Sequence, residues 1–472
     1  MKTTTHGALS RLHKFAGVIV APFLIVAALS GFFYALAPTL EQWVYHDEIT
    51  ATAQGSPRSL DEQIAAAQRQ HPGAAVAAVE ASEDPEETTR VLFTDPDAKS
   101  PSYTHAVFVD PVDLRITGEE QQYGGSRALP LRTWLSNGHR TLWLGEPGRI
   151  YAELAASWLG ALTIAGVYLW LKRRKKNQKK NNKALRIHAR LGSWLLPGFL
   201  FLTITGLTWS MVAGSNIGKV REELNWKEPS VATSVAEAGA GSGGHAGHAG
   251  HEGHESHAGH SGGEVTDNDV LEGAQTALST ARSEGLTGVL RMTPPEQVGD
   301  AWTVREGRAA YKLRSDAVAV TADGRVIDRI NSADWPLAAR LTSWLIQLHM
   351  GTLFGIYSQV ALAALALGLL VISIAGLWMW WNKPRRRLPE LKITPAVVAG
   401  VVIYSIIAPL FGASLLLFFA GDWLVRRLRP QSRSRSRSGS QSGPGRSNGD
   451  SGPTARPRGE SSSRIPSTVQ NG

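Results

Sequence analysis

Residues 186–198 read RIHARLGSWLLPG, so a histidine between two arginines stands where an apolar run begins. Residues 11–23 read RLHKFAGVIVAPF and repeat this order. Aligned on the two histidines, the shared residues are Arg11 with Arg186, His13 with His188, Gly17 with Gly192, Pro22 with Pro197 and Gly31 with Gly206. Every pair is separated by 175 residues, and such a constant separation predicts an internal duplication.

A second set of matches supports the duplication. It consists of His139 with His349, Gly145 with Gly355, Ile164-Ala165-Gly166 with Ile374-Ala375-Gly376, and Trp170 with Trp380. These pairs are 210 residues apart, so the second of two long loops exceeds the first by 35 residues. A Gly/His-rich insert at 243–263 accounts for much of this excess.

Four apolar runs have the length of about 20 residues that crosses a bilayer as a helix. They are Phe15–Leu36, Ile150–Leu171, Leu191–Val212 and Tyr357–Trp381. The first run ends in a sequence like a signal-peptide cleavage site, but its opening recurs deep in the chain, which favours a retained span. A fifth run, 397–420, contains Pro409 and Gly412. It is one kinked span or a re-entrant hairpin, and its length favours the single span.

The basic residues predict the orientation. Residues 172–190 contain ten Lys or Arg and no acid, which places this connection in the cytoplasm. The N-terminus is then cytoplasmic, the two long loops are extracytoplasmic, and we expect a multi-pass protein in the lipid bilayer of the cytoplasmic membrane. The arginine-rich tail also favours the cytoplasm, whereas a single fifth span would place it outside, so its side stays open.

The two long loops have the pattern of small α+β domains. The first predicts a helix at 59–70 and strands at 89–94 and 105–109, and the second repeats this order at 270–282, 301–305 and 317–320. The fold class is therefore a membrane α-helical bundle of two duplicated halves, four core spans plus a C-terminal fifth, with two small α+β extracytoplasmic domains. The predicted segments are 1–36, the N-terminus and first span; 37–139, an extracytoplasmic domain; 140–212, the second and third spans with the basic loop; 213–349, the second extracytoplasmic domain with its insert; 350–392, the fourth span and a basic segment; 393–428, the fifth span or hairpin; and 429–472, a disordered Arg/Ser-rich tail.

Two halves of equal topology are related by a pseudo-two-fold axis along the membrane normal. This axis pairs His13 with His188 at the inner face and His139 with His349 at the outer face. Two neutral imidazoles that face each other can bind a haem from both sides, which leaves no open iron position and suits electron transfer. The chain has no cysteine, so covalent haem attachment through C-x-x-C-H is excluded.

The duplicated glycines fit the same hypothesis. Gly31 follows His13 by 18 residues, which is five helical turns, so it lies on the same face about 27 Å along the helix. A glycine there would let the second macrocycle approach the backbone. The candidate cofactor-binding glycines are Gly31, Gly206, Gly166 and Gly376. The alternative is that these are helix-packing glycines and that the histidines are interfacial and solvated.

The motifs RLHKFAG, GHRTLWLGEPGR, RIHARLG and LHMGTLFG resemble those of the PepSY-associated transmembrane proteins, which include iron-regulated membrane proteins and ferric-siderophore reductases. The resemblance covers about residues 8–425. It implies two b-type haems with bis-histidine ligation and PepSY-like domains in the outer loops. The implied ligands are His13, His139, His188 and His349. The second half has Met350 where the first has Arg140, so a partner for an outer haem propionate is expected in one half only.

The insert contains a histidine at every third position among Gly and Ala, which predicts disorder. These are His245, His248, His251, His254, His257 and His260. Imidazoles at this density bind divalent metals such as Zn, Cu or Ni, and the spacing does not select one. The alternative is a solvated linker without a role.

The sequence thus predicts a haem-dependent ferric or ferric-siderophore reductase that supports iron uptake. Its electron donor would be a quinol or a soluble flavoprotein, because no nucleotide-binding fingerprint is present. The alternative is a non-enzymatic membrane protein that binds or senses metal through the His-rich loop. A transporter is disfavoured because the spans have almost no ionisable residues. No nucleic-acid partner is expected.

Overall fold

The computed structural model describes residues 5–98, 100–174, 183–234, 271–297, 299–382 and 394–428. The six histidines of the insert, most of the basic connection and the tail from 429 lie outside these described residues. The chain forms two compact units, Met1–Phe419 and Ala420–Gly472. In the second, the guanidinium of Arg427 lies 5.0 Å from the centre of the Trp423 ring.

Among the described residues, three helices are long and apolar enough to cross a membrane, and a bent pair makes a possible fourth. The three are α1 (Thr5–Val44), α5 (Glu146–Arg174) and α13 (Ile356–Trp381); the pair is α6 (Lys183–Trp194) with α7 (Leu196–Thr208). All four predicted runs are therefore largely helical. The third predicted run, which forms α6 and α7, bends by 64° between these two helices. Pro197, in the first turn of α7, has no N–H and so cannot continue the backbone hydrogen bonds of α6.

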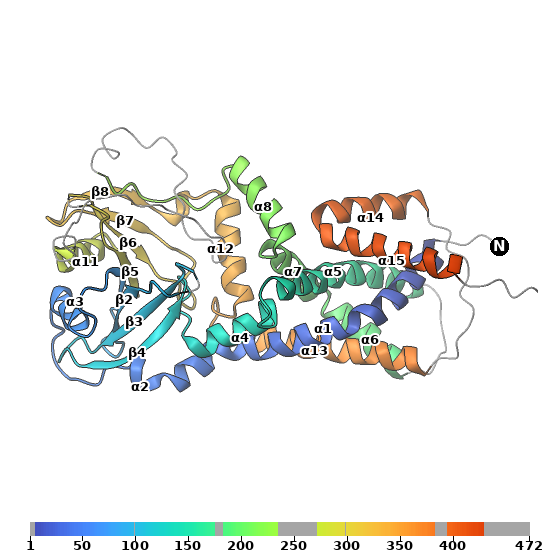
Figure 1. The fold of residues 1–472 in the computed structure, drawn as a ribbon, viewed down its shortest axis with the longest axis horizontal. Helices are drawn as coiled ribbons and strands as arrows, with labels where there is room; N and C mark the ends of the chain where they lie inside the picture. The colour runs from blue at the N-terminus through green and yellow to red at the C-terminus, as the bar shows by residue number, and fades with distance from the viewer. Residues whose placement is uncertain are drawn as a thin grey trace, which may run out of the picture. The chain divides into compact units, whose positions relative to one another are not determined.

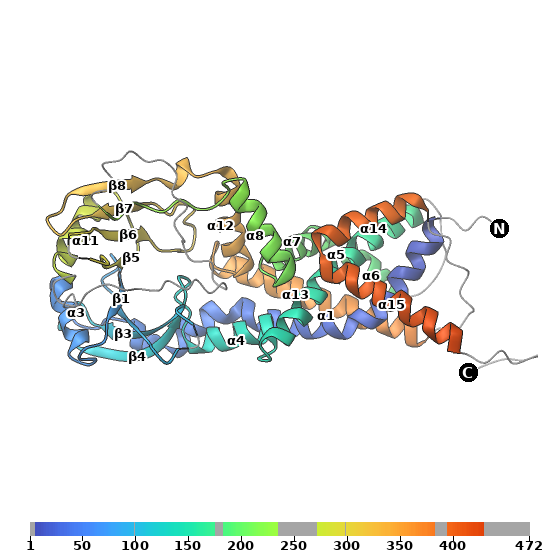
Figure 2. The ribbon, with the colours of Figure 1, turned by 45° about the horizontal axis from the view of Figure 1, so that its top comes forward.

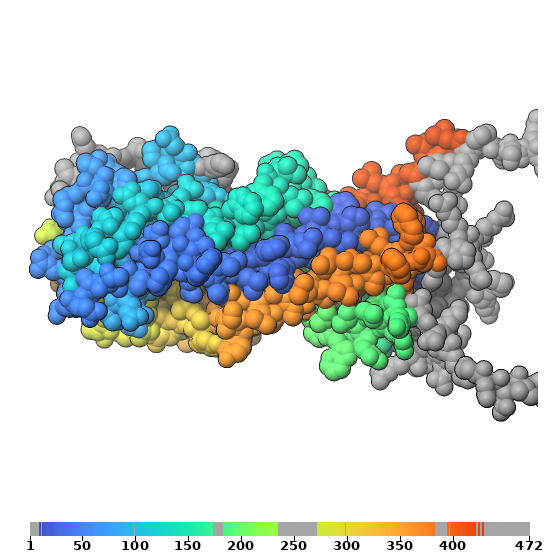
Figure 3. Space-filling model, turned by 90° about the horizontal axis from the view of Figure 1, so that it is seen from below, coloured from blue at the N-terminus to red at the C-terminus, as the bar shows by residue number. Residues whose placement is uncertain are grey.

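The long helices pack at close range. Helix α1 lies along α13 and α5, α6 lies on α13, and α7 lies on α5. Figure 3 shows α1 and α13 side by side on one face. A Cβ added at Gly368 would meet a methyl of Leu195, so glycine lets this leucine pack closely on α13 where α13 meets the bend between α6 and α7.

The fifth apolar run is divided into α14 (Pro395–Ile407) and α15 (Pro409–Leu428). Figures 1 and 2 show the first part of α15, up to Phe419, beside α14, and the rings of Tyr404 and Phe411 are 5.0 Å apart. The Tyr404 hydroxyl donates to the Ser157 carbonyl of α5. The run is therefore two shorter apolar helices that meet at Ala408-Pro409, rather than one continuous helix. The reason is local: the residue before a proline avoids helical geometry, and Ala408 has ψ of 80°.

Eight antiparallel strands form a single sheet in the order β4-β3-β2-β1-β5-β6-β7-β8 (Figure 1). They are β1 (Val76–Ala81), β2 (Thr89–Thr94), β3 (Tyr103–Val109), β4 (Ile116–Tyr123), β5 (Leu290–Thr293), β6 (Trp302–Glu306), β7 (Ala317–Val320) and β8 (Val326–Ile330). The strand predictions at 89–94, 105–109, 301–305 and 317–320 correspond to β2, β3, β6 and β7. The two predicted α+β domains share this one sheet, because β1 of the first loop pairs with β5 of the second.

Two helices cover one face of this sheet and close its main core. They are α3 (Leu60–Gln68) and α11 (Ala274–Ser283), at the sites of the two predicted helices. Ser59 and Glu62 form a capping box that fixes the start of α3. The core between helices and sheet includes Trp302 and Phe93, both almost fully buried.

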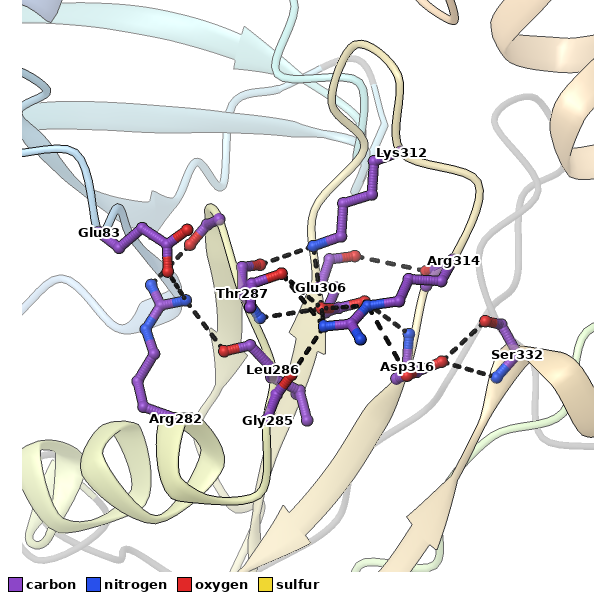
Figure 4. A network of polar contacts seen from close by, with 12 residues as sticks. Glu83, Arg282, Gly285, Leu286, Thr287, Glu306, Lys312, Arg314, Asp316 and Ser332 are labelled. Atoms are coloured by element: carbon purple, nitrogen blue, oxygen red, sulfur yellow. Dashed lines mark hydrogen bonds and ion pairs between the residues drawn. The ribbon is translucent and has the colours of Figure 1, made fainter.

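Buried ion pairs join the two halves of the sheet. Glu80 on β1 accepts hydrogen bonds from Arg127 at 2.9 Å and from Arg291 at 2.8 Å, and Arg291 is its register partner on β5. Across the same junction, Figure 4 shows Arg282 on α11 donating to Glu83, and within the second half it shows another buried carboxylate, Glu306, which accepts from Arg314 and the backbone N–H of Thr287. The junction is therefore held by charge pairing as well as by the strand ladder.

The remaining described helices lie near the sheet or connect it to the long helices. They are α2 (His46–Ile49), α4 (Pro130–Thr141), α8 (Val212–Glu223), the short 3-10 helix η1 (Ser332–Asp334) and α12 (Leu337–His349). Two of them matter for the site, because α4 and α12 each carry one predicted histidine near the C-terminal end.

Candidate functional site

The predicted histidines come together in two pairs. We call His13 and His188 the distal pair, because they lie on α1 and α6 away from the sheet, and His139 and His349 the sheet-side pair. The ring centroids of the distal pair are 6.0 Å apart, and the ring planes are nearly perpendicular. If a metal ion bound one nitrogen of each ring at the usual distance of about 2.0–2.1 Å, the two ring centres would be separated by a length similar to this one.

The distal pair is supported by the second and fourth long helices. Nδ1 of His188 lies 3.1 Å from the carbonyl oxygen of Ile372 on α13. A carbonyl only accepts, so Nδ1 carries the proton and Nε2 keeps its lone pair. Leu162 occupies the equivalent position 210 residues earlier, and its carbonyl faces His13. The buried Nδ1 of His13 nevertheless has no hydrogen-bond partner, so this ring has unused bonding capacity.

The predicted glycines Gly166 and Gly376 lie beside the distal pair. A Cβ at Gly166 would lie 3.3 Å from Cε1 of His13, and one at Gly376 would lie 3.8 Å from Cε1 of His188. Each glycine thus leaves room for one imidazole on the neighbouring span.

The sheet-side pair lines one cavity within the first unit. Its walls include His139, His349, Gly31 and Gly206, with α1, α5, α7 and α13 contributing small and apolar residues. A Cβ at Gly31 would lie 3.0 Å from Cε1 of His139, so α1 approaches this ring as closely as glycine allows. Gly206 also faces Ala156, where a Cβ would lie 3.3 Å from the alanine methyl.

Hydroxyl groups fix the tautomers of the sheet-side pair. Ser30 Oγ lies 3.0 Å from Nδ1 of His139, and Thr205 Oγ1 lies 2.7 Å from Nδ1 of His349. Each hydroxyl can donate its own proton within its helix, Ser30 to the Val26 carbonyl and Thr205 to that of Phe201. The histidine is then the donor, so Nδ1 carries hydrogen and Nε2 keeps a free lone pair.

Burial keeps these two imidazoles neutral, which is the form that binds metals. Both lie outside the apolar spans. Burial, with a smaller effect of the Arg140 charge, lowers the pKa of His139 to about 4. Burial and the proximity of His139 lower the pKa of His349 to about 3.

Cationic side chains line the cavity. Arg140 and Arg149 come from the first half of the chain, and Arg308 comes from the segment after β6 in the second half. Both halves of the chain therefore contribute arginine to the cavity wall. Met350, which replaces arginine in the motif, also lines the cavity. Arginine pairs well with carboxylates, so this rim suits a ligand that carries acidic groups.

Two buried acids position the helices around this cavity. Glu41 near the end of α1 accepts a hydrogen bond from the backbone N–H of Leu129, at the start of the helix that carries His139. Glu153 on α5 accepts from the backbone N–H groups of Val212 and Ala213 at the start of α8, and it lines the cavity. A carboxylate at a helix N-terminus satisfies unpaired N–H groups and complements the helix dipole.

Sequence reasoning missed Ser30, Thr205 and Glu153 as site residues. A signal for the first two was present: each is the small hydroxyl residue directly before a duplicated glycine, at the same offset of 175. Glu153 was visible as the sole acid in the long apolar runs. Its bonding partners on α8 could not be read from spacing.

A family model described as the PepSY-associated TM region matches residues 10–383. The chain belongs to this family. The matched range contains both histidine pairs and the whole sheet. Membership indicates a membrane protein of the iron-regulated type. A comparison with curated proteins found no match.

Proposed function

We propose that the chain is a transmembrane electron-transfer protein that holds two b-type haems and reduces ferric iron or a ferric siderophore on the extracytoplasmic side, in support of iron uptake. The observation that carries this proposal is the presence of two buried histidine pairs in one helix bundle. Three of the four rings have Nδ1 bonded to a protein oxygen, which leaves Nε2 as the ligand atom. When bound between the paired imidazoles, the haems would supply one-electron redox chemistry at iron.

The residues fit this cofactor in three respects. The ligand set is neutral imidazole, the usual axial ligand where a protein has no cysteine. Gly31 and Gly166 leave space where a side chain would press on a histidine ring. The arginines around the sheet-side cavity, Arg140, Arg149 and Arg308, would bind the acidic groups of a porphyrin and orient it.

We also propose that the two halves are duplicates related by a pseudo-two-fold axis. The eight-stranded sheet supports this, because four strands from each half meet at the β1–β5 pair. The hydroxyl-before-glycine pairs, Ser30-Gly31 and Thr205-Gly206, bind corresponding histidines in the two halves. The duplication explains why a pair is built from residues so far apart in the chain.

The proposed orientation places the distal pair at the cytoplasmic side and the sheet outside, in the cytoplasmic membrane. The basic residues of the connection between α5 and α6 support this orientation. A quinol or a soluble flavoprotein would then deliver electrons near His13 and His188. The ferric chelate would dock near the sheet. The His-rich insert, residues 243–263, would bind divalent metal peripherally.

The haem content of the purified full chain tests the proposal. We expect two non-covalent haems per chain after expression with a haem supply, with a sharp α-band on dithionite reduction. A reduced spectrum without an α-band would refute the reductase and leave the alternative, a non-enzymatic metal-binding membrane protein.

Alanine variants of the four histidines test the pairing. His13→Ala, His188→Ala and the double variant should each lose the same distal haem and look alike, because residues that act as a unit are not additive. His139→Ala or His349→Ala should spare that haem and stop reduction of an external ferric chelate. His46→Ala, an exposed histidine on α2, is the control. If His13→Ala and His139→Ala removed one and the same haem, the proposed pairing would be wrong.

A further inference from the structure

A second constellation of ligand-type side chains lies on the sheet, outside both histidine pairs. His71, His105 and Glu119 each contribute one ligand atom, and these three atoms lie within 4.8 Å of one another. It is the one group of three or more such residues found in the described part of the chain. Both histidines contact the same carboxylate oxygen: Nε2 of His71 is 3.1 Å and Nε2 of His105 is 3.2 Å from Oε2 of Glu119.

The sheet fixes two of the three residues. His105 lies on β3 and Glu119 on β4, and the register pairs Val107 with Glu119 and His105 with Gln121. His105 and Glu119 are therefore diagonal neighbours on one face of the sheet, close enough for long side chains to meet. Phe93, the register partner of His105 on β2, lies in the core below them.

A tight turn fixes the third residue. The segment His71-Pro72-Gly73-Ala74 follows α3, and the N–H of Ala74 donates to the carbonyl of His71. Gly73 has φ of 80°, which together with proline before it matches a type II turn. The His71 ring is 5.4 Å from that of Phe93 and 4.7 Å from that of His105. The turn thus places this ring over the other two ligands.

The separations suit a small divalent cation. Zinc binds imidazole nitrogen and carboxylate oxygen at about 2.0–2.2 Å, so tetrahedral ligands are about 3.3–3.5 Å apart. The two nitrogen–oxygen distances of 3.1 and 3.2 Å are close to this value. An ionised carboxylate can only accept, so both Nε2 atoms must carry a proton in these hydrogen bonds. For a cation to bind, the proton on each Nε2 would move to Nδ1 by way of water, which leaves a neutral imidazole with a free Nε2 lone pair. Two bonds to metal would then replace the two hydrogen bonds, and the cation would pair the carboxylate charge.

We propose that His71, His105 and Glu119 form a binding site for a divalent transition-metal ion, with zinc as its probe. A two-histidine, one-carboxylate set is a borderline ligand set that suits Zn²⁺ and other first-row ions. Its three side chains are about one-third exposed, at 31%, 33% and 34%. The ion therefore keeps at least one position open to water or to an external ligand. The site would be exchangeable rather than a closed structural centre.

Zinc titration by calorimetry, monitored on the full chain and on a chain lacking residues 243–263, tests this proposal. The shorter chain removes the histidine tract, so we expect one Zn²⁺ per chain to remain. His105→Ala and Glu119→Gln should each weaken zinc binding about 100-fold or more. The reason is that removing a residue that only hydrogen-bonds to a metal ligand already lowers metal affinity about 10–100-fold. His46→Ala and Glu83→Gln, changes of the same kind outside the cluster, should leave zinc binding unchanged.

Three results decide the outcome. Circular dichroism and haem content first establish that each variant is folded. If the alanine variant unfolds, Glu119→Gln still tests the site, because it keeps the shape of an exposed side chain. X-ray absorption at the zinc edge should show two imidazoles in the shorter chain and one after His105→Ala. A folded shorter chain that binds no zinc, or zinc binding that survives both substitutions, would overturn the proposal without affecting the haem assignment.

Discussion

Replacement of Thr205 by valine tests the proposed tautomer of His349 most directly. The substitution keeps the side-chain shape and removes the oxygen that lies 2.7 Å from Nδ1 of this ring. Nδ1–H then becomes a buried donor without its partner, and the ring is free to rotate or to change tautomer. Leaving a buried donor unpaired costs about 1–3 kcal/mol.

This cost should appear as weaker haem binding at the sheet side. At about 1.4 kcal/mol per factor of ten, it corresponds to about 5- to 150-fold. This range includes the loss of metal affinity, about 10–100-fold, that follows when a residue hydrogen-bonded to a metal-bound histidine is removed. The assay is the rate at which each variant loses haem to an excess of an apo-protein acceptor, followed in the Soret band. The distal haem serves as the internal reference, because its ligands do not touch Thr205.

The same helix offers a matched control. Thr208 donates its hydroxyl to the carbonyl of Ile204, just as Thr205 donates to that of Phe201, and Thr208 is not bonded to a histidine. Thr208→Val therefore removes an equal intrahelical bond and should not change haem loss. Thr205→Ser keeps the hydroxyl and should restore retention. If Thr205→Val retained haem like the wild type, or if Thr208→Val lost it equally fast, the tautomer argument would fail.

Three further predictions concern the packing, the sheet and the insert. Gly31→Ala places a methyl 3.0 Å from a histidine ring and should lower sheet-side haem occupancy several-fold by absorption, whereas Gly17→Ala meets nothing within 4 Å and should be neutral. Glu80→Gln breaks a buried ion pair and should lower the free energy of unfolding, measured by denaturant titration, by about 3–5 kcal/mol. Glu83→Gln breaks an exposed ion pair and should lower it by about 0–1 kcal/mol. Burial alone would raise the pKa of Glu80, but the charges of two arginines outweigh burial and hold this pKa below its ordinary value. The stabilisation by the Glu80 ion pairs is therefore present at neutral pH and is lost as the pH falls through the lowered pKa. Deletion of 243–263 should leave haem content unchanged and weaken divalent-metal binding, measured by absorption and calorimetry.

Each of these has a result that contradicts it. Equal haem occupancy in the Gly31 and Gly17 variants would remove the argument for a close approach at α1. A Glu80→Gln variant as stable as the Glu83 variant would mean that the strand ladder alone joins the halves. Loss of haem after deletion of the insert would show that a ligand has been misassigned.

The sequence by itself determined the long helices and the partners within each histidine pair. A bilayer demands about 20 apolar residues per helix, so composition was enough to locate the spans. A duplication keeps equivalent residues at equal offsets, so the separation of 175 residues between His13 and His188 was enough to predict that these two rings meet. Periodicity also located β2, β3, β6 and β7.

Only the tertiary structure decided how these elements are joined. The pairing of β1 with β5 brings together Glu80 and Arg291, which are 211 residues apart in the chain. The sequence of β1 does not alternate, and the alternation in β5 covers only four residues. The hydroxyls of Ser30 and Thr205 acquire their role from helices that cross near α4 and α12. His71, His105 and Glu119 meet because of a turn, a register and a diagonal contact, although 48 residues separate the first from the last. Such contacts depend on the packing of distant segments, which no local spacing encodes, and they fix the orientation of each ligand atom.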